Sequence, residues 1–388
     1  MINAGSGNMD GLPDHHVDLI VTSPPYPMIE MWDDMFFKQN PDIKTFYRDK
    51  DISLMFESMH NILDRVWAEC FRVLKKGGFL CINIGDATRT VYDNFHLFPN
   101  HARILHCLTN LGLTILPAII WRKQTNAPNK FMGSGMLPAG AYVTLEHEYI
   151  LIARKGGKRE FITAREKENR QESAFFWEER NMFFSDVWMD VKGTRQHLGD
   201  QDARKRSAAF PFEVAYRLIN MYSVKGDMVL DPFWGTGTTS LAAAVAARNS
   251  TGYEIDAGLS NIFSKNKAEL VSFSKVVIDE RLDNHVRFVE ARIEKQKPLK
   301  HQNVRYGFPV ITNQEKNLFI NPLDNIVKNP ANGMTVVYAQ TPQKRFDKDW
   351  DSHHNEPLKE PDNKKSEKRA SKKAPQKKEG GFTQMELF

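Results

Sequence analysis

The sequence of 388 residues has few cysteines and no metal-binding pattern. Its three cysteines, Cys70, Cys81 and Cys107, form no CxxC pair, and an odd number argues against a disulfide framework. We expect them to be small core residues. Histidine and cysteine are nowhere spaced as zinc ligands are. The sequence therefore predicts a globular protein without disulfides and without a metal site.

Long apolar runs are also missing. No stretch approaches the ~20 apolar residues that a membrane helix needs. The N-terminal residues 1–5 lack the basic and apolar regions of a signal peptide. We therefore expect a cytoplasmic protein without a membrane partner.

Two common phosphate-binding motifs are absent, and the chain outside its C-terminal tail has no excess of positive charge. There is no GxGxxG and no GK[ST], which disfavours dinucleotides and nucleoside triphosphates as ligands. The net charge is +5, but residues 364–378 alone carry +7, which leaves −2 for the rest. Any affinity of the folded part for nucleic acid must therefore come from a local patch.

Strands and helices alternate along the first 256 residues. Short apolar runs predict buried strands at 17–21, 79–84, 113–121, 149–153, 228–230 and 251–255. Helical spacing is found at 52–75, 102–111, 212–222 and 240–248. Such alternation favours an α/β fold with a mainly parallel sheet.

One strand is followed by a glycine turn and a helix. Asp231 ends the strand, Gly235 and Gly237 lie in the turn, and Glu254 comes 19 residues after Gly235, at the end of the next strand. Glycines let the backbone approach a ligand closely, and a helix start offers free N–H groups. In nucleotide-binding α/β folds, an acid about 20 residues on accepts ribose hydroxyls. This segment is therefore the predicted cofactor site.

A second motif, Thr22-Ser23-Pro24-Pro25-Tyr26, also follows a buried strand. Both motifs thus lie at carboxyl ends of strands, where α/β folds bind ligands. If the two strands are neighbours, the motifs face each other. Proline fixes φ and donates no N–H, so the segment is held extended with its carbonyls available.

These segments resemble a known family. Residues 210–256 are similar to motifs X, I and II of DNA amino-methyltransferases, and TSPPY is similar to their motif IV. The matching residues are Phe210-Pro211, Ile219, Ser223, Gly226 to Phe233, Gly235 to Thr239, Ala242-Ala243, Arg248 and Gly252 to Ile255. In this chain the catalytic motif comes before the cofactor motif. This permuted order is typical of the β class of these methyltransferases. The resemblance implies a circularly permuted, Rossmann-like S-adenosylmethionine-dependent methyltransferase fold.

The resemblance also implies roles for individual residues. S-adenosyl-L-methionine is the expected cofactor, with Asp231 and the glycine turn near its methionine moiety and Glu254 on its ribose. The predicted cofactor-binding residues are Asp231, Pro232, Phe233, Gly235, Gly237, Thr238, Thr239 and Glu254. These enzymes usually carry an acid near the position of Gly5-Ser6 that contacts the adenine ring. Its absence here leaves that contact unassigned, with Asp10 as a candidate substitute.

The catalytic residues are predicted to be Ser23, Pro24, Pro25 and Tyr26. A base amine is a poor nucleophile because its lone pair is delocalised into the ring. Ser23 Oγ and the Pro24 carbonyl can accept its two N–H groups and turn the lone pair toward the methyl group. Tyr26 offers a face on which the base can stack, and the base must leave the duplex to arrive there. No cysteine follows a proline, as the nucleophile of cytosine-C5 methyltransferases does.

The resemblance also bears on the target base. Ser23, at the position before the two prolines, favours cytosine N4 as the target. Aspartate is commoner there in adenine-N6 enzymes, although the rule has exceptions, so adenine N6 is the alternative. An RNA or protein-amide methyltransferase and an inactive DNA-binding module are further alternatives. We expect duplex DNA as the substrate and a cognate restriction endonuclease as a functional partner.

Five segments are expected. Residues 1–154 form the catalytic half, 155–207 the candidate target-recognition region, 208–270 the cofactor-binding half and 271–340 an extension of unknown role. Residues 341–388 form a basic tail that we expect to be disordered. Candidate contacts to bases or phosphates in the recognition region are Arg170, Arg180, Lys192, Arg195, Gln196, Arg204, Lys205 and Arg206.

Three weaker signals remain open. Gly85-Asp86 ends a strand and either lines the pocket or caps a helix. The run Trp121-Arg122-Lys123, with Asn126 and Lys130, either contacts phosphates or is a solvated strand end. The chain ends in Gln384-Met385-Glu386-Leu387-Phe388, which resembles the peptide with which bacterial replication proteins bind the sliding clamp.

Overall fold

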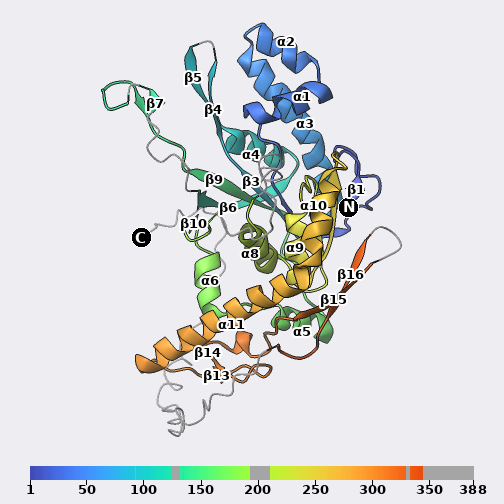
Figure 1. The fold of residues 1–388 in the computed structure, drawn as a ribbon, viewed down its shortest axis with the longest axis vertical. Coiled ribbons are helices and arrows are strands. Elements are labelled where there is room, and N and C mark those ends of the chain that lie inside the picture. The colour runs from blue at the N-terminus through green and yellow to red at the C-terminus, as the bar shows by residue number, and fades with distance from the viewer. Residues whose placement is uncertain (92, 124–131, 134, 193–209, 329–332, 344–388) are drawn as a thin grey trace, which may run out of the picture. The chain divides into compact units, whose positions relative to one another are not determined.

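A computed structural model describes residues 1–91, 93–123, 132–133, 135–192, 210–328 and 333–343. Residues 1–346 form one compact unit. At its centre is a sheet of eight strands (Figure 1), in the order β1, β12, β11, β2, β3, β9, β6, β10. The bounds in that order are Ile2–Asn3, Asn249–Glu254, Met228–Asp231, Val17–Thr22, Leu74–Ile84, His147–Lys155, Leu113–Arg122 and Val187–Trp188.

Five of the seven pairings in this sheet are parallel. The two antiparallel pairings both involve β9, which lies between β3 and β6. The predicted α/β fold with a mainly parallel sheet is confirmed.

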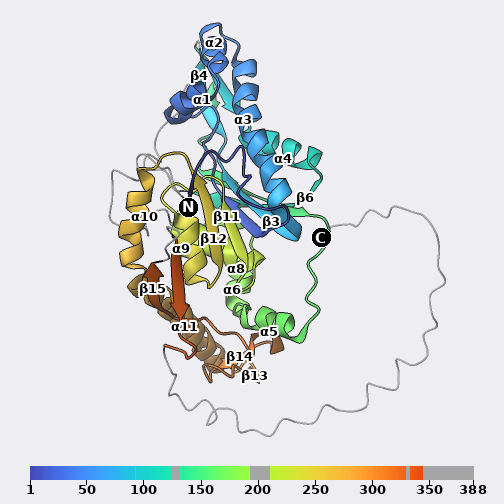
Figure 2. The same cartoon turned by 90° about the vertical axis from the view of Figure 1, so that its right-hand side faces the viewer.

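Helices cover both faces of the sheet (Figure 2). Side chains alternate along each strand, so that Ile20 and Leu80 pack on one face while Leu19 and Cys81 pack on the other. The first face carries α3 (Ile52–Val73) and α4 (Asn100–Asn110), and the second carries α8 (Phe212–Tyr222) and α9 (Thr238–Val245). All three cysteines are buried and free, as expected.

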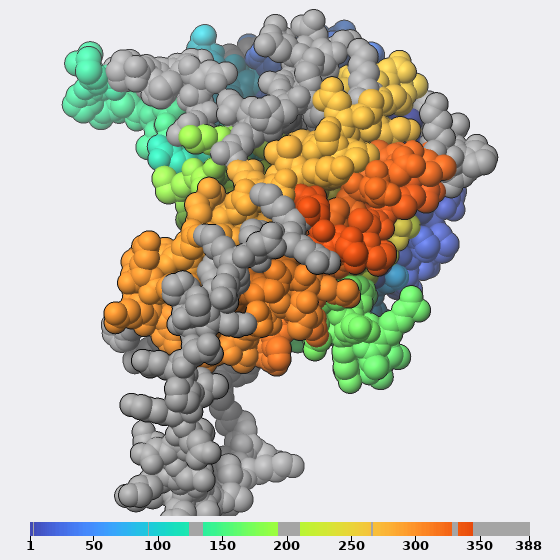
Figure 3. Space-filling model, turned by 60° about the horizontal axis from the view of Figure 1, so that its bottom comes forward, coloured from blue at the N-terminus to red at the C-terminus, as the bar shows by residue number. Residues whose placement is uncertain are grey.

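Further elements project from this core. The helices are α1 (Asp33–Gln39), α2 (Asp42–Arg48), α5 (Ala164–Glu172), α6 (Trp177–Phe183), α10 (Leu259–Ala268) and α11 (Leu270–Glu294). The two-stranded sheets are β4–β5 (Ala87–Val91, Asn94–Phe98), β7–β8 (Met132–Gly133, Ala141–Tyr142), β13–β14 (His301–Gln302, Pro309–Val310) and β15–β16 (Leu323–Lys328, Met334–Tyr338). Figure 3 shows α11 and the β15–β16 hairpin side by side on one face.

The predicted elements agree with the structure, although their boundaries differ by a few residues; the difference is largest at the start of β3, and α9 is displaced at both ends. β3 begins at Leu74 rather than at residue 79, because residues 74–78 continue beside β2, where the pairing register shifts between Val17 and Leu19. α9 begins at Thr238, directly after the turn, rather than at residue 240. Residues 270–340 contain no motif that the sequence could assign, yet the 25-residue helix α11 lies there.

Candidate active site

The two sequence motifs meet at one edge of the sheet. β2 and β11 are parallel neighbours, with Leu19 beside Val229 and Ile20 beside Leu230. The carboxyl ends of both strands therefore open at the same edge, where parallel α/β sheets bind their ligands. The expectation that these strands are adjacent is confirmed.

Asp231 joins the motifs by hydrogen bonds. Its Oδ1 accepts from Thr22 Oγ1 at 2.7 Å, and its Oδ2 accepts from Thr239 Oγ1 at 2.7 Å. The backbone N–H of Phe233 donates to Oδ1 as well, at 3.1 Å. Burial raises the pKa of this carboxyl to about 6, against the three hydrogen bonds, which lower it. Thr22 belongs to the TSPPY motif, but its hydrogen bond to Asp231 was not predicted from the sequence.

Packing fixes the glycine turn after β11. Gly235 and Gly237 have positive φ angles of 53° and 80°, a conformation that strains other residues. A Cβ on Gly237 would lie 2.4 Å from the ring of Phe263 and 2.8 Å from that of Trp234. The indole N–H of Trp234 donates to Ser240 Oγ at 2.8 Å. The backbone at the start of α9 is therefore tightly held.

The predicted cofactor-binding residues surround this turn. Glu254, at the end of β12, accepts from the backbone N–H groups of Gly235 at 2.8 Å and Asp256 at 2.9 Å. Its carboxylate is half-buried and retains lone pairs for a further donor. Pro232 is buried and Thr238 is half-buried. Phe233 packs edge-on against Trp67 of α3, with ring centroids 5.9 Å apart.

The predicted catalytic residues follow β2. Pro24 and Pro25 are buried, whereas Ser23 and Tyr26 are only half-buried. Ser23 Oγ donates to the phenol oxygen of Tyr26 at 3.1 Å. Gly85 gives the phenol ring its space, since a Cβ there would lie 3.0 Å from Tyr26 Cε2. Tight packing thus positions the side chains that remain accessible to a ligand.

Asn83 and Glu148 contact Tyr26, and Lys123 contacts Glu148. The sequence did not predict these roles. The Tyr26 hydroxyl donates to Glu148 Oε2 at 3.1 Å and accepts from Asn83 Nδ2 at 2.9 Å. Asn83 Nδ2 also donates to Glu148 Oε2 at 2.7 Å. Lys123 Nζ donates to Glu148 Oε1 at 2.7 Å. The signal available in the sequence was Asn83, a polar residue inside an otherwise apolar strand.

Burial and the charge of Glu148 raise the pKa of the Tyr26 phenol well above its usual value. Tyr26 therefore keeps its proton at neutral pH and can donate it. Asn83 is buried. Its Oδ1 is among the buried side-chain atoms of the described residues that have no hydrogen-bond partner.

The two strand ends that the sequence left open make structural contacts, and Gly85 also borders the ring of Tyr26. Asp86 accepts from the backbone N–H of His101 at 3.1 Å, at the start of α4, so it caps that helix. Trp121 is buried and donates to the Val191 carbonyl at 3.0 Å. Arg122 pairs with Glu146 at 3.0 Å. Asn126 and Lys130 lie outside the described residues.

The N-terminus lies beside the cofactor half. β1 pairs with β12, so that Asn3 is next to Glu254. Asp10 is exposed and accepts from the side chain of Asn8 at 2.9 Å.

The candidate recognition region packs against the C-terminal extension. Glu179 of α6 and Arg281 of α11 form a buried ion pair, with distances of 2.6 and 2.8 Å. The Phe176 ring stacks on His285 with centroids 4.0 Å apart. Of the candidate nucleic-acid contacts, Arg170, Arg180 and Lys192 are exposed, and Arg195, Gln196, Arg204, Lys205 and Arg206 lie outside the described residues.

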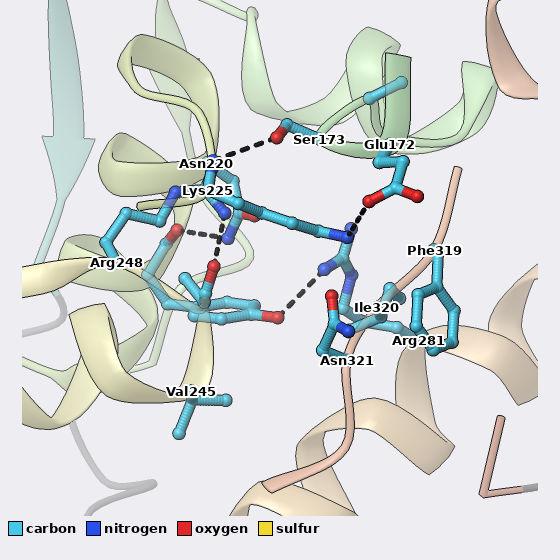
Figure 4. Close-up of a pocket in the computed structure, with 13 residues that line it drawn as sticks. Glu172, Ser173, Asn220, Lys225, Val245, Arg248, Arg281, Phe319, Ile320 and Asn321 are labelled. Carbon is cyan, nitrogen blue, oxygen red and sulfur yellow. Dashed lines mark hydrogen bonds and ion pairs between the residues drawn. The ribbon is translucent and has the colours of Figure 1, made fainter. Parts of the chain in front are cut away.

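A cavity lined largely by polar and charged residues lies away from these motifs, and Figure 4 shows the residues that line it. Lys225 and Arg248, which line it, come just before β11 and β12, whereas the active site follows these strands. Lys225 pairs with Glu172 at 3.3 Å. Arg248 donates to the side chain of Ser223 at 3.0 Å and to its carbonyl at 2.7 Å. These contacts connect α5 and the segments that follow α8 and α9. The cavity is therefore separate from the candidate active site.

Comparison with known proteins gives the same assignment. A family model described as DNA methylase, of the N6/N4 type, matches residues 17–265. The chain belongs to this DNA methylase family. The expected amino-methyltransferase class is thereby confirmed.

Curated relatives share much of the chain. The Type II methyltransferase M.MthZI of Methanothermobacter thermautotrophicus is 50% identical over 81% of this chain and 87% of its own length. The Type II methyltransferase M.MjaI of Methanocaldococcus jannaschii is 47% identical over 66% of this chain and 87% of its own.

A solved structure from Thermus thermophilus, described as a putative DNA modification methylase, is 31% identical over 69% of this chain and 92% of its own. The TM-score is 0.54, and that protein is complexed with S-adenosyl-L-methionine. In the described part of this chain, no helix is long and apolar enough to cross a membrane.

Proposed function

We propose that this DNA methyltransferase transfers a methyl group from S-adenosyl-L-methionine to the exocyclic N4 of cytosine in duplex DNA. The observation that carries the proposal is the buried 2.7 Å hydrogen bond between Thr22 and Asp231. This bond holds the residue before Ser23 against the residue that begins the glycine turn. An acceptor for the target amine and a binding turn for the methyl donor thus share one edge of the sheet.

The residues around the turn fit this cofactor. The first N–H groups of α9 have no partner inside the helix and can bind a negatively charged group, such as the carboxylate of the methionine moiety. The Glu254 carboxylate, held by two backbone N–H groups, can accept from the ribose hydroxyls. When bound, the cofactor supplies an electrophilic methyl group on a sulfonium.

The catalytic residues act by positioning and electrostatics rather than by covalent catalysis. Ser23 Oγ and the Pro24 carbonyl accept the two N–H groups of the target amine. The lone pair of the nitrogen then turns out of the plane of the base. Tyr26 supports the flipped base, and the neighbouring hydrogen bonds fix these groups before the reaction begins.

The identity of the target base rests on Ser23. A neutral hydroxyl at this position favours cytosine N4, and adenine N6 is the alternative. Both targets present an amine with two N–H groups, so the proposed acceptors serve either base.

Radiolabelled methyl transfer tests the substrate class. The protein is incubated with tritiated cofactor and, in separate reactions, with duplex DNA, RNA or total protein. We expect label in the DNA reaction that DNase releases. Label that RNase or protease releases instead would identify an RNA or protein-amide methyltransferase, and cofactor binding without transfer would identify an inactive DNA-binding module.

Tyr26→Ala and Asp231→Ala separate the two half-sites. We expect Tyr26→Ala to bind S-adenosylhomocysteine normally and to turn over poorly. Asp231→Ala should lose cofactor binding, because the turn loses three hydrogen bonds. Calorimetric titration measures both affinities, and unchanged affinity in the Asp231 variant would contradict the assignment.

A restriction endonuclease is the proposed functional partner. The support is that two relatives are Type II methyltransferases by name. Plasmid DNA methylated by this protein should resist an endonuclease that recognises the same sequence.

We also propose that the C-terminal peptide binds a sliding clamp. It consists of Gln384-Met385-Glu386-Leu387-Phe388, outside the described residues. Tethering would raise the concentration of the enzyme at newly replicated DNA. Fluorescence anisotropy with a labelled peptide of residues 380–388 should give micromolar binding to purified clamp. Equal binding after Leu387→Ala and Phe388→Ala would contradict it.

A further inference from the structure

A line of hydrogen bonds runs from Lys123 to Ser23. Lys123 Nζ lies 2.7 Å from Glu148 Oε1, and Glu148 Oε2 lies 3.1 Å from the Tyr26 hydroxyl. The Tyr26 hydroxyl lies 3.1 Å from Ser23 Oγ. Glu148 is 122 positions from Tyr26 in the chain and is buried at 8% exposure.

The direction of each hydrogen bond in this line follows from the chemistry of its groups. A carboxylate only accepts, so Tyr26 must donate its single proton to Glu148. The phenol oxygen then has only lone pairs for its other neighbours. It accepts from Asn83 Nδ2 at 2.9 Å and from Ser23 at 3.1 Å. The proton of Ser23 is thereby directed at Tyr26.

We propose that Glu148 is a positioning residue that sets the direction of the Ser23–Tyr26 hydrogen bond, so that Ser23 presents only acceptor lone pairs to the target amine. With the opposite direction, Tyr26 would occupy a lone pair of Ser23, and the free serine proton would face the N–H groups of the base. Two donors would then meet. The inference rests on the proposed function, because it assumes that Ser23 accepts from an amine.

Lys123 completes the arrangement. Its side chain is about half-exposed, and its ammonium group pairs with the buried carboxylate, which compensates the charge of Glu148. Lys123 and Glu148 also lie at the ends of β6 and β9 that point toward the active-site edge, where the backbone N–H of Lys123 donates to the Glu146 carbonyl at 2.8 Å. Both residues are thus held by the sheet rather than by a loose loop.

Glu148→Gln tests the proposal with little change of shape. The amide oxygen of the new glutamine accepts from Lys123, as Glu148 Oε1 does. The amide N–H group then faces the Tyr26 phenol and donates to it. Tyr26 then loses its acceptor and can turn its own proton toward Ser23, and Asn83 Nδ2, which donates to the same oxygen of Glu148, loses that acceptor too. We expect the single-turnover rate of methyl transfer, at saturating cofactor and DNA, to fall at least tenfold. The affinities for S-adenosylhomocysteine and DNA should stay within threefold of the wild-type values.

A double-mutant cycle with Tyr26→Phe separates this role from a general structural one. Phenylalanine has no hydroxyl through which Glu148 could act on Ser23. Glu148→Gln should therefore change the rate by less than twofold in the Tyr26→Phe background. An equal loss in both backgrounds would overturn the proposal.

Two further controls keep the result interpretable. If thermal unfolding shows that Glu148→Gln is misfolded, Glu148→Ala is tested in the same two backgrounds, with the same criterion of non-additivity. The wild-type enzyme is assayed first for the methylated nucleoside. A wild type that methylates no amine refutes the proposed function, whereas an active wild type with additive mutants refutes only the role of Glu148.

Discussion

Thr22 and Asp231 lie 209 positions apart and share a buried hydrogen bond of 2.7 Å. The bond exists because β2 and β11 are parallel neighbours whose carboxyl ends coincide. It connects the residue before Ser23, the proposed catalytic serine, to Asp231, which precedes the proposed cofactor turn. The relative position of the two half-sites thus depends on this side-chain contact as well as on the sheet.

Thr22→Val removes this contact and keeps the size of the side chain. A hydrogen bond to a charged group contributes roughly 1.5–3 kcal/mol, so we expect the free energy of unfolding to fall by about that amount. The rate of methyl transfer should fall as well, because the two half-sites lose one of the contacts that hold them in place. Thr22→Ser keeps the hydroxyl and is the matched control. Chemical denaturation and single-turnover assays measure both, and equal behaviour of the two variants would contradict the account.

Asp231→Asn should change how stability depends on pH. Burial raises the pKa of Asp231 from 3.8 to about 6. An acid with a raised pKa stabilises the folded state below about pH 4, and this contribution is lost as the pH rises through about 6. Asparagine does not titrate, and its amide can donate to Thr239, whose hydroxyl also lies 3.3 Å from the Val21 carbonyl.

Relative to wild type, the Asp231→Asn variant should therefore gain up to about 3 kcal/mol between pH 4 and pH 7. Urea denaturation at several pH values measures this difference. A constant difference across the range would show that Asp231 does not titrate as described.

Gly237→Ala should weaken cofactor binding. The residue has a φ of 80°, and a Cβ would lie 2.4 Å from Phe263. Gly226 also has a φ of 80°, but a Cβ there would meet no atom within 4 Å in the described residues. Both alanine variants therefore carry a similar backbone strain of about 1 kcal/mol. Only Gly237→Ala should lose affinity for S-adenosylhomocysteine, by at least tenfold, and an equal loss in both would contradict the role of the turn.

The buried pair of Glu179 and Arg281 should be essential for stability. Arg281→Met leaves a buried carboxylate without its partner, which costs about 3–5 kcal/mol. Adding Glu179→Gln should recover part of this loss. Arg48 and Asp49 form an exposed pair, so Arg48→Met, the control, should change stability by less than about 1 kcal/mol. Thermal and chemical unfolding measure the effects. A similar loss of stability for the buried and the exposed pair would show that the Glu179–Arg281 pair does not stabilise the contact between α6 and α11.

The sequence predicted the parts of the fold that depend on local pattern. Apolar runs located β2 and β11, and the glycine turn located the start of α9 to within two residues. It could not predict that Glu148 contacts Tyr26, because that contact depends on the antiparallel pairing of β3 with β9. The helix α6 is short, and the burial of its Glu179 depends on Arg281, 102 residues away in the chain.

The most direct test of the account is mass spectrometry of nucleosides from DNA methylated in vitro. Duplex DNA is incubated with the enzyme and deuterated S-adenosyl-L-methionine, then digested and compared with unmethylated DNA. We predict deuterated N4-methylcytosine. N6-methyladenine would contradict the assignment of the base and leave the amine mechanism intact. Deuterated 5-methylcytosine would contradict the mechanism itself, because carbon methylation requires a nucleophile other than the acceptors at Ser23 and Pro24.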